Sequence, residues 1–314
     1  MAEARRPLGR RAAVRPAGRA GSRLWRLARV ALPAATFAVL LWRLGTGPFV
    51  DGLRTVDAAA LAAAAGLAAL TTVCCAWRWR TVARGLGLDL PLGAAVAAYY
   101  RSLFLNLTLP GGVLGDVHRG VSHGRDTRDV GRGLRAVAWE RSAGQVVQAV
   151  LTLVVLLALP SPVQRLVPYI ALGLLLALTA VALLARIRPR VRRAVAGDLR
   201  AVLARRAWPA VALASALVVA GHTLTFLIAA QTAGASAPPS RMVPLALLVL
   251  LAAALPNVGG WGPREGMTAW AFAAVGLGAS RGVATAVVYG VMVFVSTLPG
   301  AAVLAVGWLR GRRG

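Results

Sequence analysis

The hydrophobic positions of this chain form long continuous runs rather than a spaced pattern. Such runs occur at Leu151–Leu159, Ile170–Ala185, Val211–Ala230 and Val283–Leu309, and none of them contains an arginine or a carboxylate. A helix needs about 20 mostly apolar residues to cross the hydrocarbon layer of a bilayer. Runs of this number and length exceed what a water-soluble core contains. The pattern therefore predicts an all-α polytopic membrane protein.

The runs predict about six full spans. We expect these at residues 26–44, 57–77, 136–159, 165–186, 208–231 and 282–309. Together they define one transmembrane domain, residues 26–309, with short basic tails at 1–25 and 310–314. The first apolar stretch follows a basic N-terminus, as in a signal peptide, but it lacks a convincing small-residue cleavage site. We therefore interpret it as a retained first span.

The arginines predict how the spans are oriented, because cytoplasmic loops are enriched in basic residues. The segments expected inside are both termini, the turn with Arg78, Arg80 and Arg84, the segment 119–141 and the loop 186–206. The loops expected outside are 45–56, 160–164 and 232–241. The predicted location is the bacterial plasma membrane, with both termini cytoplasmic.

Two further apolar stretches, 91–123 and 242–279, are interrupted by proline and glycine. If the first crossed the membrane completely, the arginine-rich segment 119–141 would lie outside, against the rule for basic loops. The second must also return to the side it came from, because the last span carries arginines to the inside. Both stretches are therefore predicted to be re-entrant hairpins that enter from opposite faces.

The two interrupted stretches share a motif of Leu-Pro, then Gly-Gly, then a further glycine followed by charge. Proline ends a helix and glycine permits a sharp bend, and such backbone survives at membrane depth only against protein or a wet cavity. Paired interruptions of this kind are typical of inverted-repeat transporters, and new helix ends favour anions. An ordinary interfacial loop is the alternative. The expected bend residues are Pro110, Gly111, Gly112, Gly115, Pro256, Gly259, Gly260 and Gly262.

Composition excludes one partner class that the net charge of +26 would otherwise suggest. The chain is 58% hydrophobic and 15% charged, and its mean hydropathy is +0.68. All 36 basic residues are arginine, and they lie between apolar runs and in the tails rather than among aromatic residues on a folded surface. This placement is typical of loops facing anionic lipid, so we do not expect a nucleic-acid partner.

Three ordered motifs resemble the transmembrane, flippase-like domain of the lysylphosphatidylglycerol synthase family. They are Asn106 to Arg119 around Leu-Pro-Gly-Gly, Ala138-Trp139-Glu140-Arg141, and Gly259 to Gly266 with the sequence GGWGPREG. Trp139 departs from the aliphatic residue usual before Glu-Arg. The resemblance implies a lipid-translocating domain. In the full-length synthases an aminoacyl-transferase domain follows; here the chain ends at Gly314, so we expect a stand-alone member without synthase chemistry.

The ionisable residues in these motifs are the candidate lipid-headgroup site, because charged groups within spans usually mark a pathway. Arg264 is expected to meet a lipid phosphate and Glu265 to orient or neutralise it, with a structural ion pair as the alternative. Glu140 and Arg141 lie at the start of an expected span and could instead be interfacial. Asp116 could cap the returning helix. The full candidate set is Arg264, Glu265, Arg141, Glu140, Arg119, Asp116 and Asn106.

The remaining polar and aromatic residues suggest structural roles. Adjacent Cys74 and Cys75 are interpreted as packing residues, and His222, alone in an apolar helix, as a helix–helix hydrogen-bond partner. No metal set, nucleotide loop or catalytic triad occurs, so we expect no cofactor, no metal and no ATP hydrolysis. An interfacial aromatic belt is predicted from Trp25, Trp42, Trp77, Trp79, Trp208 and Trp308.

Three functions remain open from the sequence. The first is translocation of a phospholipid, or another lipid-linked anion, between leaflets, with Arg119, Arg141 and Arg264 contacting the headgroup. The second is an enzyme that modifies lipid headgroups, with Glu140 or Glu265 as general base, although no nucleophile or metal accompanies them. The third is a non-catalytic subunit that scaffolds a separate lipid-modifying enzyme.

Overall fold

The part of the chain that the structure describes is built from helices. The computed structural model describes residues 38, 41–42, 45–109, 112–159, 163–187, 189–205, 207–255 and 262–311. Its elements in chain order are α2 (Gly47–Arg54), α3 (Ala58–Gly85), α4 (Leu92–Thr108), α5 (Leu114–Asp126), α6 (Val130–Ala158), η1 (Gln164–Leu166), α7 (Val167–Ile187), α8 (Pro189–Val202), α9 (Trp208–Thr232), α10 (Pro239–Ala252), α11 (Pro263–Ala274) and α12 (Ala279–Gly311).

Within the described residues, the four helices α3, α6, α9 and α12 are long and apolar enough to cross a membrane. They coincide with four of the six expected spans. The expected span 26–44 lies mostly outside the described residues. The expected span 165–186 is occupied by the 21-residue α7. The apolar segment Gln164–Leu176, which contains η1 and the first part of α7, is shorter than a membrane span. The all-helical prediction is thus confirmed, whereas the expected number of spans is not.

Several helix starts follow from local sequence. Asp57 and Asp129 precede α3 and α6, and their carboxylates accept hydrogen bonds from the backbone N–H groups of Ala60 (2.6 Å) and Arg132 (2.8 Å). These bonds satisfy N–H groups that have no partner within the helix. Proline occupies the first turn of α2, α9 and α10, where its missing N–H costs nothing.

The distribution of apolar and charged side chains is inverted relative to a soluble protein. Large apolar side chains are exposed, among them Leu175 and Leu176 on α7 and Leu213 on α9. Arg119 and Glu140, in contrast, have no exposed surface. Exposed leucines on long helices are stable when hydrocarbon surrounds them. The inversion agrees with a multi-pass membrane protein.

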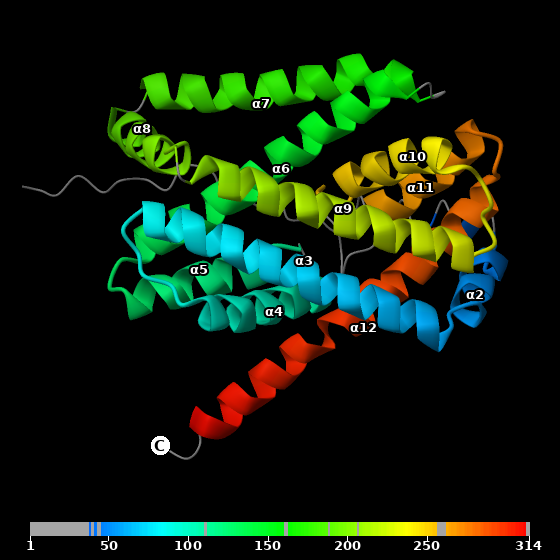
Figure 1. Cartoon of the computed structure of the whole chain (residues 1–314), viewed down its shortest axis with the longest axis horizontal. Coiled ribbons are helices and arrows are strands. Elements are labelled where there is room, and N and C mark those ends of the chain that lie inside the picture. The colour runs from blue at the N-terminus through cyan, green and yellow to red at the C-terminus, as the bar shows by residue number, and fades with distance from the viewer. Residues whose placement is uncertain are drawn as a thin grey trace, which may run out of the picture.

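Two pairs of short helices, α4–α5 and α10–α11, lie between the long ones. The members of each pair pack against each other, and their connections run through 109–113 and 253–262. Figure 1 shows the first pair at the end of the bundle that carries α8, hereafter the α8 end, and the second pair at the opposite end, beside α2. α4 has 17 residues, or about 26 Å of helix, less than the roughly 30 Å of hydrocarbon.

Glycines bring α5 close to its neighbours. A Cβ atom added at Gly115 would collide with the carbonyl oxygen of Ser102 on α4. On the other side of α5, a Cβ at Gly133 of α6 would lie 2.8 Å from the Cα of Gly124. Small residues at helix contacts allow backbones to approach closely in membrane proteins. The polar helix α5 is therefore held tightly between α4 and α6.

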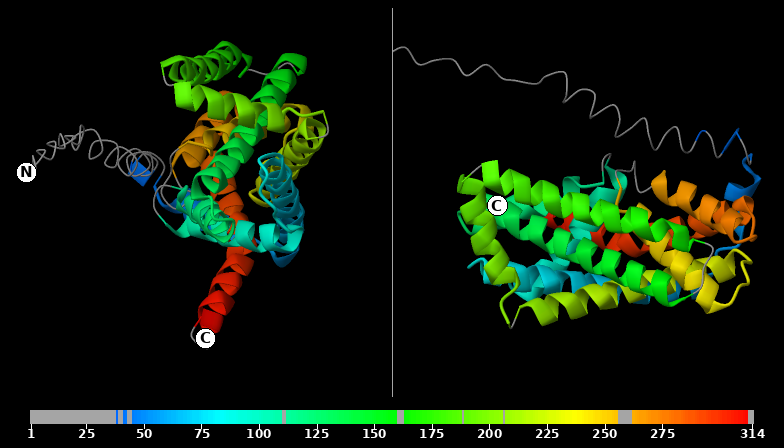
Figure 2. Two further views of the ribbon diagram at one scale, coloured as in Figure 1. Left: turned by 90° about the vertical axis from the view of Figure 1, so that its left-hand side faces the viewer. Right: turned by 90° about the horizontal axis from the view of Figure 1, so that it is seen from above.

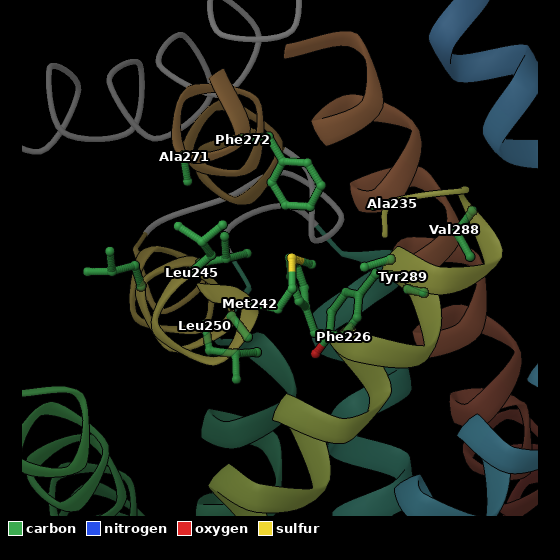
Figure 3. Packing of buried hydrophobic residues seen from close by; sticks show 14 of the residues in the cluster. Phe226, Ala235, Met242, Leu245, Leu250, Ala271, Phe272, Val288 and Tyr289 are labelled. Carbon is green, nitrogen blue, oxygen red and sulfur yellow. The ribbon is translucent and has the colours of Figure 1, made fainter. Parts of the chain in front are cut away.

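Two buried clusters of apolar residues stabilise the two ends. The larger one joins α9, α10, α11 and α12, and Figure 3 shows Phe226 beside Tyr289, with Met242 and Phe272 nearby. The rings of Phe226 and Tyr289 have centroids 6.0 Å apart. The second cluster contains Trp79 and Tyr99 and joins α3, α4 and α6 near the α8 end. Viewed from above in Figure 2, α6, α7 and α9 run along the length of the molecule.

Candidate functional site

A buried carboxylate, Glu140 of α6, lies at the centre of an ion network. One of its oxygens accepts a hydrogen bond from Nε of Arg78 on α3 (2.8 Å), and the other accepts one from Nη2 of Arg119 on α5 (2.7 Å). The hydroxyl of Tyr99 on α4 donates to the same carboxylate at 3.3 Å. Four helices therefore meet at one buried negative charge. Such a charge is stable only when it is paired and hydrogen-bonded.

Arg119 is enclosed by aromatic rings as well as by carboxylates. Its guanidinium carbon lies 4.7 Å from the ring centroid of Trp79 and 4.3 Å from that of Tyr99. Its Nε donates to Asp116 at 3.0 Å. Attraction of a cation to aromatic faces strengthens when water is excluded. The prediction that Trp79 belongs to an interfacial belt is wrong: it is 1% exposed and faces Arg119, whereas Trp42, Trp208 and Trp308 are exposed.

Asn106 and Asp116 connect α4 to α5. The side-chain oxygen of Asn106 accepts the backbone N–H of Gly115 at 2.7 Å, and its amide nitrogen donates to Asp116 at 2.9 Å. Ser102 also donates to Asp116, at 3.1 Å. The expectation that Asp116 caps α5 is wrong, because Val113 is the N-cap residue and makes no side-chain bond. Asn106, from the preceding helix, binds a free N–H group of the first turn instead.

Arg78 is a site residue that the sequence analysis assigned to a cytoplasmic turn. That assignment is wrong because α3 continues to Gly85, so Arg78 lies inside the helix and is 5% exposed. Its Nη1 also donates to Ser215 on α9, at 3.0 Å. The available signal was the sequence Trp77-Arg78-Trp79, an arginine directly continuous with an apolar run. Tyr99 and Ser215 were missed because nothing in their local sequence distinguishes them.

Arg141 adds a further positive charge beside the network. It pairs with the second oxygen of Asp116 at 3.3 Å, and its side chain keeps 40% of its surface exposed. Three arginines, Arg78, Arg119 and Arg141, thus share two carboxylates, Glu140 and Asp116. The formal balance of these five side chains is one positive charge. Because Arg141 is the most exposed of the three arginines, it is the one best placed to meet an added anion.

A cavity of about 200 Å³ adjoins the network and is lined by α3, α4, α6, α9 and α12. Arg78, Tyr99 and Arg141 form one part of its wall. The described lining contains no carboxylate, because Glu140 and Asp116 lie behind these side chains. Hydroxyl, amide and imidazole groups supply most of the remaining polar wall: Thr71, Thr72, Gln145, Gln148, Ser215, His222, Thr225, Ser296 and Thr297. This concentration of polar groups within apolar helices favours a hydrated or ligand-filled space.

The second charged pair of the sequence analysis, Arg264 and Glu265, lies in the first turn of α11. Arg264 donates to one oxygen of Glu265 through Nε (2.9 Å) and Nη2 (2.6 Å), and the other oxygen accepts the backbone N–H of Gly262 at 2.6 Å. Glu265 therefore caps α11 while neutralising its neighbour. Gly262 has φ of +119°, a conformation that other residues adopt only with strain.

The structure does not bring Arg264 and Glu265 into contact with the Glu140 network. Arg264 stacks 5.2 Å from the ring centroid of Tyr289, and the hydroxyl of Tyr289 lies 3.4 Å from Nδ1 of His222. His222 lines the cavity, so Arg264 is separated from it by two side chains. His222 lies on α9 and Tyr289 on α12, so their contact confirms the expected role of His222 in helix–helix hydrogen bonding.

The remaining expectations fall partly outside the described residues. Pro110, Gly111, Pro256, Gly259 and Gly260 lie outside them, so the predicted approach of the two Gly-Gly bends stays a prediction. Cys74 and Cys75 are free and buried, as expected of packing residues. Among the described residues, no three His, Cys, Asp or Glu side chains gather as metal ligands.

The chain belongs to the family described as the lysylphosphatidylglycerol synthase TM region, whose sequence profile matches residues 26–300. The match covers α3, α6 and α9, the first two thirds of α12, both short pairs and every residue of the Glu140 network. The class defined here is therefore a multi-pass membrane protein related to lipid modification. Neither the curated proteins nor the solved structures compared with the chain give a significant match.

Proposed function

We propose that this protein moves an anionic phospholipid, or another lipid-linked anion, between the leaflets of the membrane. The observation that carries the proposal is the polar cavity beside a buried ion network with a surplus positive charge. Arg141 is the first contact for the headgroup phosphate, since its fork of N–H groups suits a phosphate and its side chain is still 40% exposed. A lining of arginines without described carboxylates favours an anion over a cation.

In this proposal the other candidate residues position Arg141 rather than bind the headgroup. Asp116 holds Arg141, and Asn106 and Arg119 hold Asp116. Arg264 and Glu265 fix the start of α11, and Tyr289 and His222 connect Arg264 to the cavity. Transport would be facilitated or driven by an ion gradient, and lipid would leave the protein chemically unchanged.

The helix pairs α4–α5 and α10–α11 are proposed to be the two re-entrant hairpins. The short lengths of their helices and their positions at opposite ends of the bundle support this arrangement. We further propose that the α8 end faces the cytoplasm of a bacterial cell, with both termini on that side. The arginines of α5 and α8, which lie at that end, support the orientation because cytoplasmic segments are enriched in basic residues.

Leaflet exchange in liposomes tests the function. Purified protein is reconstituted with fluorescent lipids that differ in headgroup, and a membrane-impermeant quencher reports the label in the outer leaflet. We expect accelerated exchange of an anionic phospholipid over protein-free liposomes, and Arg141→Gln should slow it by about ten- to a hundred-fold, the loss of one charge-assisted contact. Arg132→Gln is the matched control, since Arg132 lies on the same helix outside the cavity and pairs with Asp129.

Two results would count against the proposal. Exchange equal to protein-free liposomes for every headgroup would remove translocation as the function. A new lipid species in mass spectra of the extracted lipids would instead indicate an enzyme acting on the headgroup.

A further inference from the structure

A second cavity, of about 400 Å³, lies on the other side of the Glu140 network. Its wall comes from the end of α3, the connection 86–91, α4, α5 and α12. Arg119 borders this cavity, whereas Arg78 and Tyr99 border the first. The ion network therefore forms part of the wall of both. A volume of this size is in the range of small-ligand sites.

Four buried polar atoms around this second cavity lack a hydrogen-bond partner. They are Nε1 of Trp79, Nε of Arg101, Nη1 of Arg119 and Nε2 of His123, and each of these residues lines the cavity. Trp79 and Arg119 are at most 1% exposed and His123 is 8% exposed. Seven such atoms occur in the described residues, so more than half gather at one place. Buried donors without partners are rare and costly, which points to a group that normally occupies the cavity.

The chemistry of these atoms defines which group could bind in the cavity. Indole Nε1 and the guanidinium nitrogens only donate hydrogen bonds, and His123 Nε2 can donate in one tautomer. The partner must therefore supply several acceptor oxygens. Arg101 forms no ion pair within the described part of the chain, whereas Arg119 is already paired with Glu140 and Asp116. The guanidinium of Arg101 is therefore available to an added oxyanion.

The residues at the rim of the cavity further restrict the charge of the group that can bind. Asp89 and Asp126 line the opening and are exposed, and Asp89 lies 3.7 Å from Arg84. Two carboxylates at the entrance disfavour a doubly charged phosphate monoester more than a singly charged phosphodiester. We propose that this cavity is a binding site for a monoanionic phosphodiester, held by Trp79, Arg101, Arg119 and His123. The site is separate from the cavity that contains Arg141 and does not depend on translocation.

Ligand-dependent unfolding tests the site, because a ligand that binds the native state raises the unfolding temperature. The full chain is purified in a neutral detergent, in an Arg141→Gln background that weakens the first cavity. Phosphatidylglycerol supplies a phosphodiester on a lipid, dimethyl phosphate supplies the same group without acyl chains, and phosphatidylcholine carries a compensating ammonium. We expect a saturable rise with phosphatidylglycerol and little rise with phosphatidylcholine. A rise with dimethyl phosphate as well would identify the headgroup alone as sufficient.

Two variants remove single donors. Trp79→Phe keeps an aromatic ring but loses the N–H, and Arg101→Gln loses the charge; each should weaken the apparent affinity about ten-fold. Their matched controls are Trp139→Phe, whose indole bonds Asp198 outside the cavity, and Arg132→Gln, and both should bind as the background protein does. Arg101 is only partly buried, so its variant keeps the test valid if Trp79→Phe does not fold.

The proposal is overturned if neither phosphatidylglycerol nor dimethyl phosphate gives a saturable rise in the unfolding temperature, because water would then satisfy the four donors. Equal affinities of Arg101→Gln and Arg132→Gln would overturn it as well. Neither result would affect translocation through the first cavity, which is measured separately by leaflet exchange with Arg141 intact.

Discussion

Glu140 and Arg119 form an ion pair with 2.7 Å between Oε2 and Nη2, and neither side chain has any exposed surface. The pair joins α6 to α5, and Arg78 joins the same carboxylate to α3. Removing two charges from solvent is expensive, and the attraction between them offsets this only in good geometry with additional hydrogen bonds. Tyr99 and Asp116 provide those bonds. The network therefore determines how α3, α4, α5 and α6 can be arranged.

Glu140→Gln should destabilise the protein strongly. The substitution preserves the shape of the side chain but leaves Arg78 and Arg119 buried without their carboxylate, a change that typically costs about 3–5 kcal/mol. Thermal unfolding in detergent should show a clear fall in the midpoint. Asp89→Asn is the control, since the Asp89 side chain is 85% exposed and its pairing with Arg84 should contribute under about 1 kcal/mol. An unchanged midpoint for Glu140→Gln would contradict the structural importance of the network.

Gly115→Ala should separate α4 from α5. The added methyl would collide with the backbone oxygen of Ser102, which cannot rotate away, and overpacking of this kind costs about 1–3 kcal/mol. Gly93→Ala is a matched control within α4, because a Cβ there meets nothing within 4 Å. Alanine is the better helix former, so Gly93→Ala should be neutral or stabilising. Gly115→Ala should therefore lower the unfolding midpoint, whereas Gly93→Ala should leave it unchanged or raise it. Equal shifts would argue against the close contact.

Arg264→Ala tests whether this arginine meets the headgroup, as the sequence suggested, or only fixes the start of α11, as proposed above. Only the first role predicts that the variant loses a headgroup contact and slows lipid movement. Losing a charge-assisted contact costs roughly 1.5–3 kcal/mol, or about ten- to a hundred-fold in rate. Arg264→Lys should retain part of the activity, since lysine keeps the charge but not the fork. Leaflet exchange of Arg264→Ala, Glu265→Gln decides between the two roles. Full activity of this double variant would make the pair purely structural, in keeping with its bond to Gly262 at the start of α11.

Cysteine labelling should place the two ends of the bundle on opposite faces. On a background lacking Cys74 and Cys75, Arg125→Cys at the α8 end is expected to react only from the cytoplasmic side. Ser236→Cys, in the connection between α9 and α10, should react only from outside. Both positions are exposed, so access to the reagent depends on topology alone. External labelling of Arg125→Cys would overturn the first re-entrant hairpin.

The helical membrane class could be predicted from local sequence because it depends on the length and apolarity of continuous segments. The same holds for the interruptions at Leu109 to Gly112 and at Leu255 to Gly262, which separate α4 from α5 and α10 from α11. Proline and glycine act on the backbone of their own segment, so these effects do not depend on the rest of the fold. The motif around Glu140 and Arg141 could likewise be recognised, although its partners could not.

The tertiary structure decided which residues pair with Glu140. Arg78 and Glu140 are 62 residues apart, and their contact depends on the rotation and crossing of α3 and α6. Counting arginines placed Arg78 in a loop because a charge next to an apolar run is usually interfacial. Arg78 is buried instead, because it pairs with the carboxylate of Glu140 on α6. In the same way, the sequence by itself determined which segments are helical and apolar, while only the packing decided which of its many arginines are enclosed and which face a cavity.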